Sequence, residues 1–112
     1  MFNVRTAKTK ENNQLEKEIE LKLKVLVEGK LGGLCLKWVC PGWSGVPDRI
    51  LLLPGGKIHF VELKRPKGGK TSELQKWWKR KLDGLGFTVW HIKDADELKY
   101  LELVLADKLA RK

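Results

Sequence analysis

Residues 45–64 read GVPDRILLLPGGKIHFVELK, and this stretch decides the fold. Two apolar runs, 50–53 and 58–61, are joined by Pro54, Gly55 and Gly56, a combination that predicts a tight antiparallel hairpin. Neither run alternates between apolar and polar residues, so we expect both strands to be central in a sheet that helices cover on both faces. The two acidic residues of the hairpin, Asp48 and Glu62, stand at its open end.

The three-residue turn predicts which side chains face each other. If Leu53 pairs with Lys57, counting back along both strands places Asp48 opposite Glu62, and Lys64 shares their face of the sheet. Directly opposed residues have Cβ atoms about 4.5–5.5 Å apart, which allows two carboxylates to bind one divalent cation. A register shift of one residue would turn Asp48 to the opposite face and dissolve this group.

Helices are expected on either side of the hairpin. Residues 13–27 carry an apolar stripe at helical spacing, and Gly29 follows it as the expected end of the helix. Ser72 and Gln75 fit the start of a second helix that runs to about Leu82, and Asp94 fits the cap of a third. The expected buried stripes are Leu15, Ile19, Leu23 and Leu26; Leu74, Trp78, Leu82 and Leu85; and Leu98, Leu101, Leu105 and Leu109.

Residues 34–39 and 87–92 complete the element order as strands. The expected order is therefore α-β-β-β-α-β-α, an α/β fold with a mixed sheet. A chain of 112 residues is long enough for one such domain and too short for two.

Composition narrows the possible partners and the compartment. Lys and Arg outnumber Asp and Glu by 23 to 14, a net charge of +9 that favours polyanions such as nucleic acid, although basic charge alone does not identify the partner. Without an apolar stretch suited to a signal peptide or a membrane span, we expect a cytoplasmic protein of a bacterial cell or phage-infected host. Cys35 and Cys40 lack the second ligand pair of a zinc site, so we expect them to be reduced and structural.

Two neighbouring carboxylates at the end of an apolar hairpin are unfavourable unless something neutralises them. Mg²⁺ together with Lys64 would do so, which indicates a metal site. The simpler interpretation of Glu62 and Lys64 is an exposed, polar strand end with ordinary surface charges. Taken alone, the E-x-K triplet does not decide between these interpretations.

The motifs become specific when they are read together. GVPD at 45–48, VELK at 61–64 and Gln75 on the following helix resemble the VRR-NUC branch of the PD-(D/E)XK nucleases, over nearly the whole chain. The resemblance implies a restriction-endonuclease-like α-β-β-β-α-β core with an extra C-terminal helix, forming one domain over residues 1–112.

The resemblance also implies roles for individual residues. Asp48 and Glu62 would be metal ligands, the backbone carbonyl of Leu63 a third ligand, and Lys64 the residue near the attacking water. Gln75 would support the site, but S-x-x-Q is also a capping box, and both roles can coexist.

A glutamate of the first helix is also part of the implied active site. Glu16, Glu18 and Glu20 are the candidates, and Glu16 lies nearest the edge of the apolar stripe at about 100° per residue. Glu20 is the second choice. The alternative for all three is a solvated face with lysine partners.

The function that this resemblance implies is a DNA endonuclease that depends on Mg²⁺, with Mn²⁺ as a substitute, and leaves 5′-phosphate and 3′-hydroxyl ends. We expect selectivity for Holliday-junction or flap-like branched DNA and a two-fold homodimer, for which Leu21 and Val25 offer a second apolar patch. The alternatives are a nuclease without structure selectivity and a non-catalytic basic module that binds nucleic acid.

Candidate DNA contacts lie around the hairpin's open end. Trp43 would stack on an unpaired base or wedge a junction, although an isolated loop tryptophan is more often a packing residue. His59 and His91 are expected to be structural residues away from the carboxylates, and Trp77, Trp78 and Trp90 to be core or interface residues. The basic candidates for backbone contacts are Arg49, Arg65, Lys67, Lys70 and Lys79.

Overall fold

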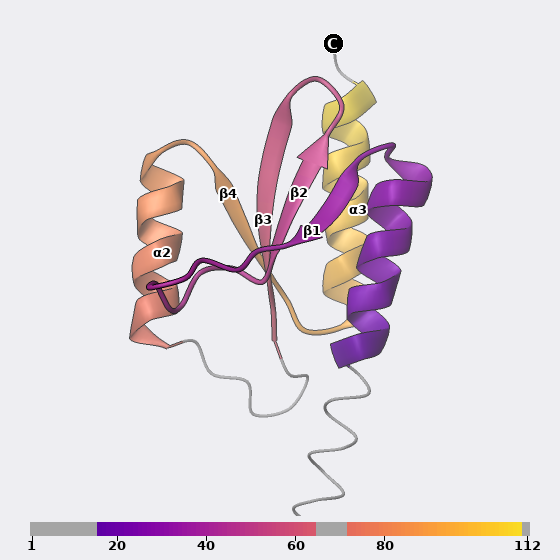
Figure 1. Cartoon of the computed structure of the whole chain (residues 1–112). Coiled ribbons are helices and arrows are strands. Elements are labelled where there is room, and N and C mark those ends of the chain that lie inside the picture. Colours follow the sequence, from indigo (N-terminus) through magenta and orange to yellow (C-terminus); the bar gives the residue numbers. More distant parts are fainter. Residues whose placement is uncertain (1–15, 65–71, 111–112) are drawn as a thin grey trace, which may run out of the picture.

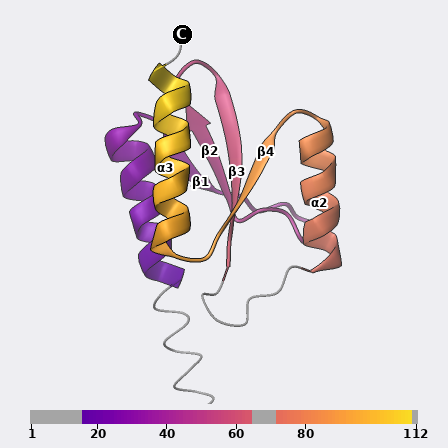
Figure 2. The ribbon, with the colours of Figure 1, turned by 180° about the vertical axis from the view of Figure 1, so that it is seen from behind.

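The computed structural model describes residues 16–64 and 72–110, which form one sheet with helices on both faces (Figures 1 and 2). Residues 16–24 are α-helical and continue directly into a π-helical segment, η1 (Val25–Lys30). The element order confirms the predicted one. The remaining elements are β1 (Leu34–Lys37), β2 (Arg49–Leu53), β3 (Lys57–Leu63), α2 (Glu73–Gly84), β4 (Thr88–Ile92) and α3 (Ala95–Ala110).

The four strands lie in the order β1-β2-β3-β4. The β2–β3 hairpin has Leu53 opposite Lys57 and Arg49 opposite Val61, which confirms the predicted register. Gly55 and Gly56 both have positive φ angles, 82° and 73°, which a side chain would disfavour in this turn. Strand β4 runs parallel to β3 because α2 carries the chain back across the sheet.

Each face of the sheet has its own core. Residues 16–30 and α3 lie side by side on one face, and α2 lies on the other (Figures 1 and 2). On the first face, Val61 and Leu63 belong to the larger core, whereas Phe60 belongs to the smaller core beneath α2. Because side chains alternate along a strand, Glu62 points to the face that α2 covers.

The predicted stripes of the two helices on the larger core are buried. Ile19, Leu23 and Leu26 are buried in the first helix, and Leu15 lies outside the described residues. In the predicted stripe of α3, Leu109 is half-buried and the other three members are buried: Leu98, Leu101 and Leu105. The Asp94 carboxylate accepts a hydrogen bond from the backbone N–H of Glu97 at 2.9 Å, so the predicted cap is present.

The end of the first helix differs from the prediction. The helix continues through Gly29 to Lys30, and the backbone N–H of Leu31 bonds to the carbonyl of Leu26 at 3.0 Å, a π-helical spacing. The chain turns at Gly32, which has a φ of 70°. The prediction that Gly29 ends the helix is therefore wrong, because a glycine can also occupy a helix interior. The helix ends before Gly32, the glycine with positive φ.

The predicted stripe of α2 is also wrong in part. Leu82 is buried and Trp78 half-buried, but Leu74 and Leu85 are 51% and 73% exposed. The smaller core has room for few helical side chains, because α2 packs mainly against the edge strand β4. The helices also leave part of the sheet uncovered near the hairpin turn, where Ile58 is exposed.

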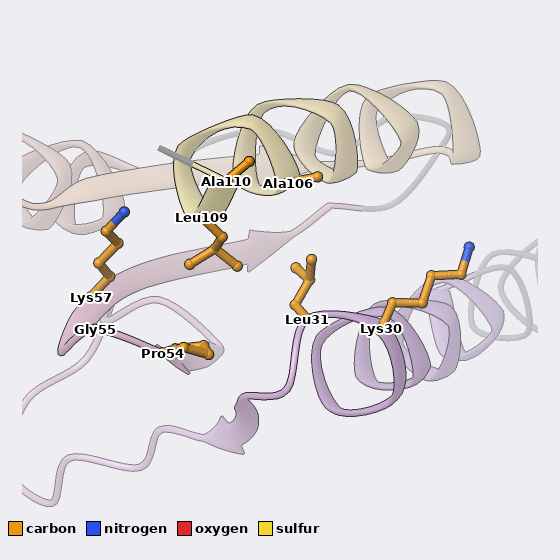
Figure 3. A pocket seen from close by; sticks show the side chains of 8 residues that line it. All are labelled: Lys30, Leu31, Pro54, Gly55, Lys57, Ala106, Leu109 and Ala110. Atoms are coloured by element: carbon orange, nitrogen blue, oxygen red, sulfur yellow. The ribbon is translucent and has the colours of Figure 1, made fainter. Parts of the chain in front are cut away.

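An open cavity of about 730 Å³ lies between the hairpin turn and the ends of η1 and α3 (Figure 3). Its lining contains two lysines, Lys30 and Lys57, and no acidic side chain. It lies at the turn end of the hairpin, whereas Asp48 and Glu62 stand at the opposite end. This cavity is therefore separate from the predicted metal site.

Two leucines of α3 test the assignment of the larger core. Leu101 is fully buried and Leu103 is 59% exposed, so both substitutions shorten a leucine in the same helix. We expect Leu101→Ala to lower the free energy of unfolding by about 2–5 kcal/mol, and Leu103→Ala by about 0.5 kcal/mol or less. Urea unfolding followed by circular dichroism measures both values, and equal losses would contradict this packing.

Candidate active site

Asp48 and Glu62 are brought together at the open end of the hairpin. Asp48 directly precedes β2, and its Oδ2 accepts a hydrogen bond from the backbone N–H of Leu63 at 2.8 Å. Glu62 is buried on the adjacent strand, one residue before Leu63. The predicted convergence of the two carboxylates is therefore present, and the contact with Leu63 holds Asp48 across the end of β3.

Gln75 joins these carboxylates to the second helix and to Lys64. Its Nε2 donates to Glu62 Oε1 at 2.8 Å, and its Oε1 accepts from Lys64 Nζ at 2.6 Å. The same Oε1 accepts from the backbone N–H of Ser72, whose Oγ accepts from the Gln75 N–H in return. Gln75 thus completes the predicted capping box and also contacts Glu62 and Lys64.

The electrostatics of Glu62 show how crowded this acidic pair is. Burial, together with the nearby Asp48 and Glu16, raises the pKa of Glu62 to about 8, against the opposing effect of Lys64. A hydrogen bond to Asp48 also favours the protonated form. Two carboxylates in so little solvent repel each other, and a bound cation would relieve that repulsion.

The glutamates of the first helix have different surroundings. Glu16 lies close enough to Glu62 to affect its pKa. Glu20 forms an ion pair with the guanidinium of Arg49, which also donates to the backbone carbonyl of Asp48 at 3.1 Å. Glu18 is exposed. The arrangement favours Glu16 as the glutamate that faces the carboxylate pair, and Glu20 as a structural partner of Arg49.

The donor set fits a hard divalent cation. Two carboxylates lie close together. The Leu63 carbonyl and the Leu63 N–H, which donates to Asp48, leave β3 on the same side of the strand. Mg²⁺ is typically held by one or two carboxylates and keeps several waters. Within residues 16–64 and 72–110 no three His, Cys, Asp or Glu side chains form a metal-binding group, so the fit rests on two carboxylates with a backbone oxygen.

His91 lies beside Glu62, although the sequence pattern predicted a position away from the carboxylates. It is the register partner of Glu62 on the parallel strand β4, so both side chains point toward α2. Its Nε2 is buried without a hydrogen-bond partner, and burial together with Lys64 and Lys79 lowers its pKa. The expected separation of His91 from the carboxylates is wrong, because that expectation did not include strand pairing across the α2 crossover.

The other histidine and the cysteines have structural surroundings. His59 is buried, and its Nδ1 accepts a hydrogen bond from Trp90 Nε1 at 3.1 Å. Cys35 and Cys40 form no disulfide. Burial, with Glu28 nearby, raises the pKa of Cys35 to about 11, which keeps this thiol protonated at neutral pH. No helix of the described ranges could cross a membrane.

The predicted DNA contacts have different surroundings. Arg65, Lys67 and Lys70 lie outside the described residues. The Arg49 side chain is mostly covered and engaged by Glu20, so its position favours a structural role. Lys79 stays accessible while it pairs with Asp83 at 2.9 Å. Trp43 is exposed and stacks on Trp77, which is half-buried and belongs to neither core.

The chain is similar to a phage protein and to a solved structure. No protein-family model matches the chain. A protein of Acyrthosiphon pisum secondary endosymbiont phage 1, named "Putative nuclease p44", is 48% identical over 60 residues, which are 54% of this chain and 63% of that protein. The match thus spans less than two thirds of the relative. A solved structure described as "VRR_NUC domain" superposes with a TM-score of 0.71 and 30% identity, over 77% of this chain and 91% of that one.

The raised pKa of Glu62 predicts a pH-dependent gain in stability for Glu62→Gln in metal-free protein. The folded state holds this proton more tightly than the unfolded state, so wild-type stability falls as the pH rises from the ordinary value of 4.5 to about 8. Glutamine cannot ionise and still offers an oxygen to Gln75. The gain should therefore grow over that range and level off above it, reaching about 4 °C or more in Tm.

Thermal unfolding in chelator between pH 5 and 9 measures this gain. Glu73→Gln is the control, because it removes a largely exposed carboxylate from the first turn of α2. Its Tm difference from the wild type should stay nearly constant with pH. If the Tm difference between Glu62→Gln and the wild type is equally independent of pH, or negative at every pH, the proposed repulsion between Asp48 and Glu62 is contradicted.

Proposed function

The chain belongs to the VRR-NUC family, and we propose that it is a metal-dependent DNA endonuclease whose active site comprises Glu16, Asp48, Glu62, Lys64 and Gln75. The observation that supports this most strongly is the pair of adjacent carboxylates that Gln75 connects to Lys64. A crowded acidic pair on a buried strand end destabilises the metal-free fold even with Lys64 nearby, and such perturbed groups cluster at functional sites.

The metal ligands in this proposal are Asp48, Glu62 and the carbonyl of Leu63, with Mg²⁺ as the ion and Mn²⁺ as a substitute. When bound, the ion supplies positive charge against the charge that develops on the phosphate in the transition state. Glu16 would complete the acidic side of the site from the first helix, where its charge already acts on Glu62.

Lys64 and Gln75 act as a unit in the hydrolysis. The capping box fixes Gln75 Oε1, which in turn holds the Lys64 ammonium beside the acidic pair. From there Lys64 orients the attacking water or donates to the scissile phosphate. The water oxygen loses a proton to solvent and bonds to phosphorus while the bond from phosphorus to the 3′-oxygen breaks. The leaving 3′-oxygen takes up a proton from solvent, which leaves a 5′-phosphate and a 3′-hydroxyl.

The substrate in this proposal is branched DNA in the cytoplasm of a bacterial cell or a phage-infected host. The net charge of +9 favours the phosphate backbone, and Lys79 with the predicted contacts Arg65, Lys67 and Lys70 would bind it without reading bases. A two-fold dimer would present two active sites to a two-fold junction. The exposed Leu21 and Val25, which line a shallow apolar groove with Leu98, support such an interface.

Cleavage of a labelled four-way junction tests the assignment of Lys64. We expect Lys64→Met to lower the cleavage rate at least about 100-fold, the loss typical of a group that stabilises transition-state charge. Junction binding should stay within about threefold, because one of many phosphate contacts is lost. Lys99→Met removes an exposed lysine of α3 and is the matched control.

Metal dependence is tested with the same substrate and with Asp48→Asn. Chelator should abolish cutting by the wild type, and Mg²⁺ or Mn²⁺ should restore it, whereas Asp48→Asn should remain inactive with either ion. Binding without cutting in every condition would identify a non-catalytic DNA-binding module. Equal residual cleavage by Asp48→Asn and Lys64→Met would point to a contaminating nuclease and against this assignment.

A further inference from the structure

Three tryptophans form an aromatic cluster beside the proposed active site. Trp43, in the segment between β1 and β2, is 60% exposed, and its ring stacks on that of Trp77 with centroids 6.2 Å apart and planes 16° from parallel. Trp78 meets both rings edge-on, with centroids 5.7 and 5.2 Å away. Trp77 and Trp78 are half-buried, and exposed apolar side chains that gather in one place indicate a binding surface.

The loop that carries Trp43 is fixed against α2. Trp78 Nε1 donates a hydrogen bond to the backbone carbonyl of Ser44 at 3.0 Å. Gly45 packs so closely that a Cβ there would lie 2.6 Å from Cβ of Leu74, and its φ of 82° also disfavours a side chain. Figure 1 shows this segment running from β1 to α2. The exposed tryptophan is therefore held in place by its neighbours.

A cavity of about 340 Å³ opens on this cluster, within the usual range for small-molecule sites. Leu74, which the helical pattern predicted to be buried, lines it instead. The cavity adjoins the proposed active site, because Leu74 directly precedes Gln75 and Gly45 lies against the Gln75 backbone. Its lining residues are Trp43, Glu73, Leu74, Trp77, Trp78 and Arg80.

The charges around the cavity indicate what kind of molecule it binds. Arg80 lines it, and the Lys81 ammonium lies 5.6 Å from the centre of the Trp77 ring. Glu73, the acidic residue of the lining, is paired with Lys76 at 3.2 Å. Indole faces bordered by cations match a nucleotide, in which a planar base is joined to a phosphate. An apolar protein segment would not use these cations.

We propose that the aromatic pocket formed by Trp43, Leu74 and Trp77 binds an unpaired nucleobase of the DNA next to the phosphate that is cut. This inference rests on the proposed function and names the feature by which the enzyme selects its substrate. In a duplex both faces of a base are covered by its neighbours, so a stacking pocket is filled only where the strand is open. Flaps, gaps and junction centres offer such bases.

Fluorescence of 2-aminopurine tests the pocket directly. The probe is placed at an unpaired position of a flap substrate, or at a paired position of a matched duplex, and titrated with the full chain in chelator. We expect quenching on the flap only. Trp43→Ala should abolish the quenching and weaken flap binding roughly tenfold, in line with the loss of one stacked base. Trp43→Phe should retain most of both, because it keeps an aromatic face.

Tyr100→Ala is the matched control, since Tyr100 is an equally exposed aromatic residue on α3, across the sheet from the pocket. It should leave quenching and affinity unchanged. Equal affinity of wild type and Trp43→Ala for the flap would overturn the proposal. So would a change of oligomeric state with Trp43→Ala, because the tryptophans would then form a protein interface.

Cleavage assays keep this inference distinct from the proposed function. The binding measurements contain no metal and need no turnover, so quenching by a protein that never cuts would support the pocket and contradict the nuclease. Conversely, Mg²⁺-dependent cutting at equal rates by wild type and Trp43→Ala, on both flap and duplex, would support the nuclease and contradict the pocket.

Discussion

The register of the β2–β3 hairpin is the constraint on which the proposed active site depends. A turn of three residues, two of them glycines with positive φ, pairs Leu53 with Lys57 and thereby sets every pair down to the open end. There Asp48 and Glu62 come together on the face that α2 covers. With a register one residue different, Asp48 would face the other core and the acidic pair would not form.

Gln75 links this acidic pair to the rest of the fold. The residue that completes the cap of α2 also contacts Glu62 and Lys64, so the start of the helix and the chemical groups are positioned by one side chain. The same helix holds the loop that carries Trp43 through the Trp78 hydrogen bond to Ser44. The acidic pair, the Lys64 ammonium and the aromatic pocket are therefore all positioned by α2, and a displacement of this helix would disturb all three.

Local sequence signals predicted much of this arrangement and missed what depends on distant contacts. The hairpin register, the cap at Asp94 and the capping box of Ser72 and Gln75 follow from short spacings, and the structure confirms them. The position of His91 beside Glu62 depends on a parallel pairing across α2, which spacing along the chain does not encode. The exposure of Leu74 depends on where α2 packs, because an apolar stripe can serve a binding surface as well as a core.

The central claim is that two crowded carboxylates at a hairpin's edge form the binding site of a divalent cation. Crystals of the full chain soaked in Mn²⁺ and measured by anomalous diffraction test it most directly. We expect a strong peak within coordination distance of both Asp48 and Glu62, on the side of the Leu63 carbonyl. A map without a peak there, or with the ion bound elsewhere while both carboxylates stay unligated, would contradict it.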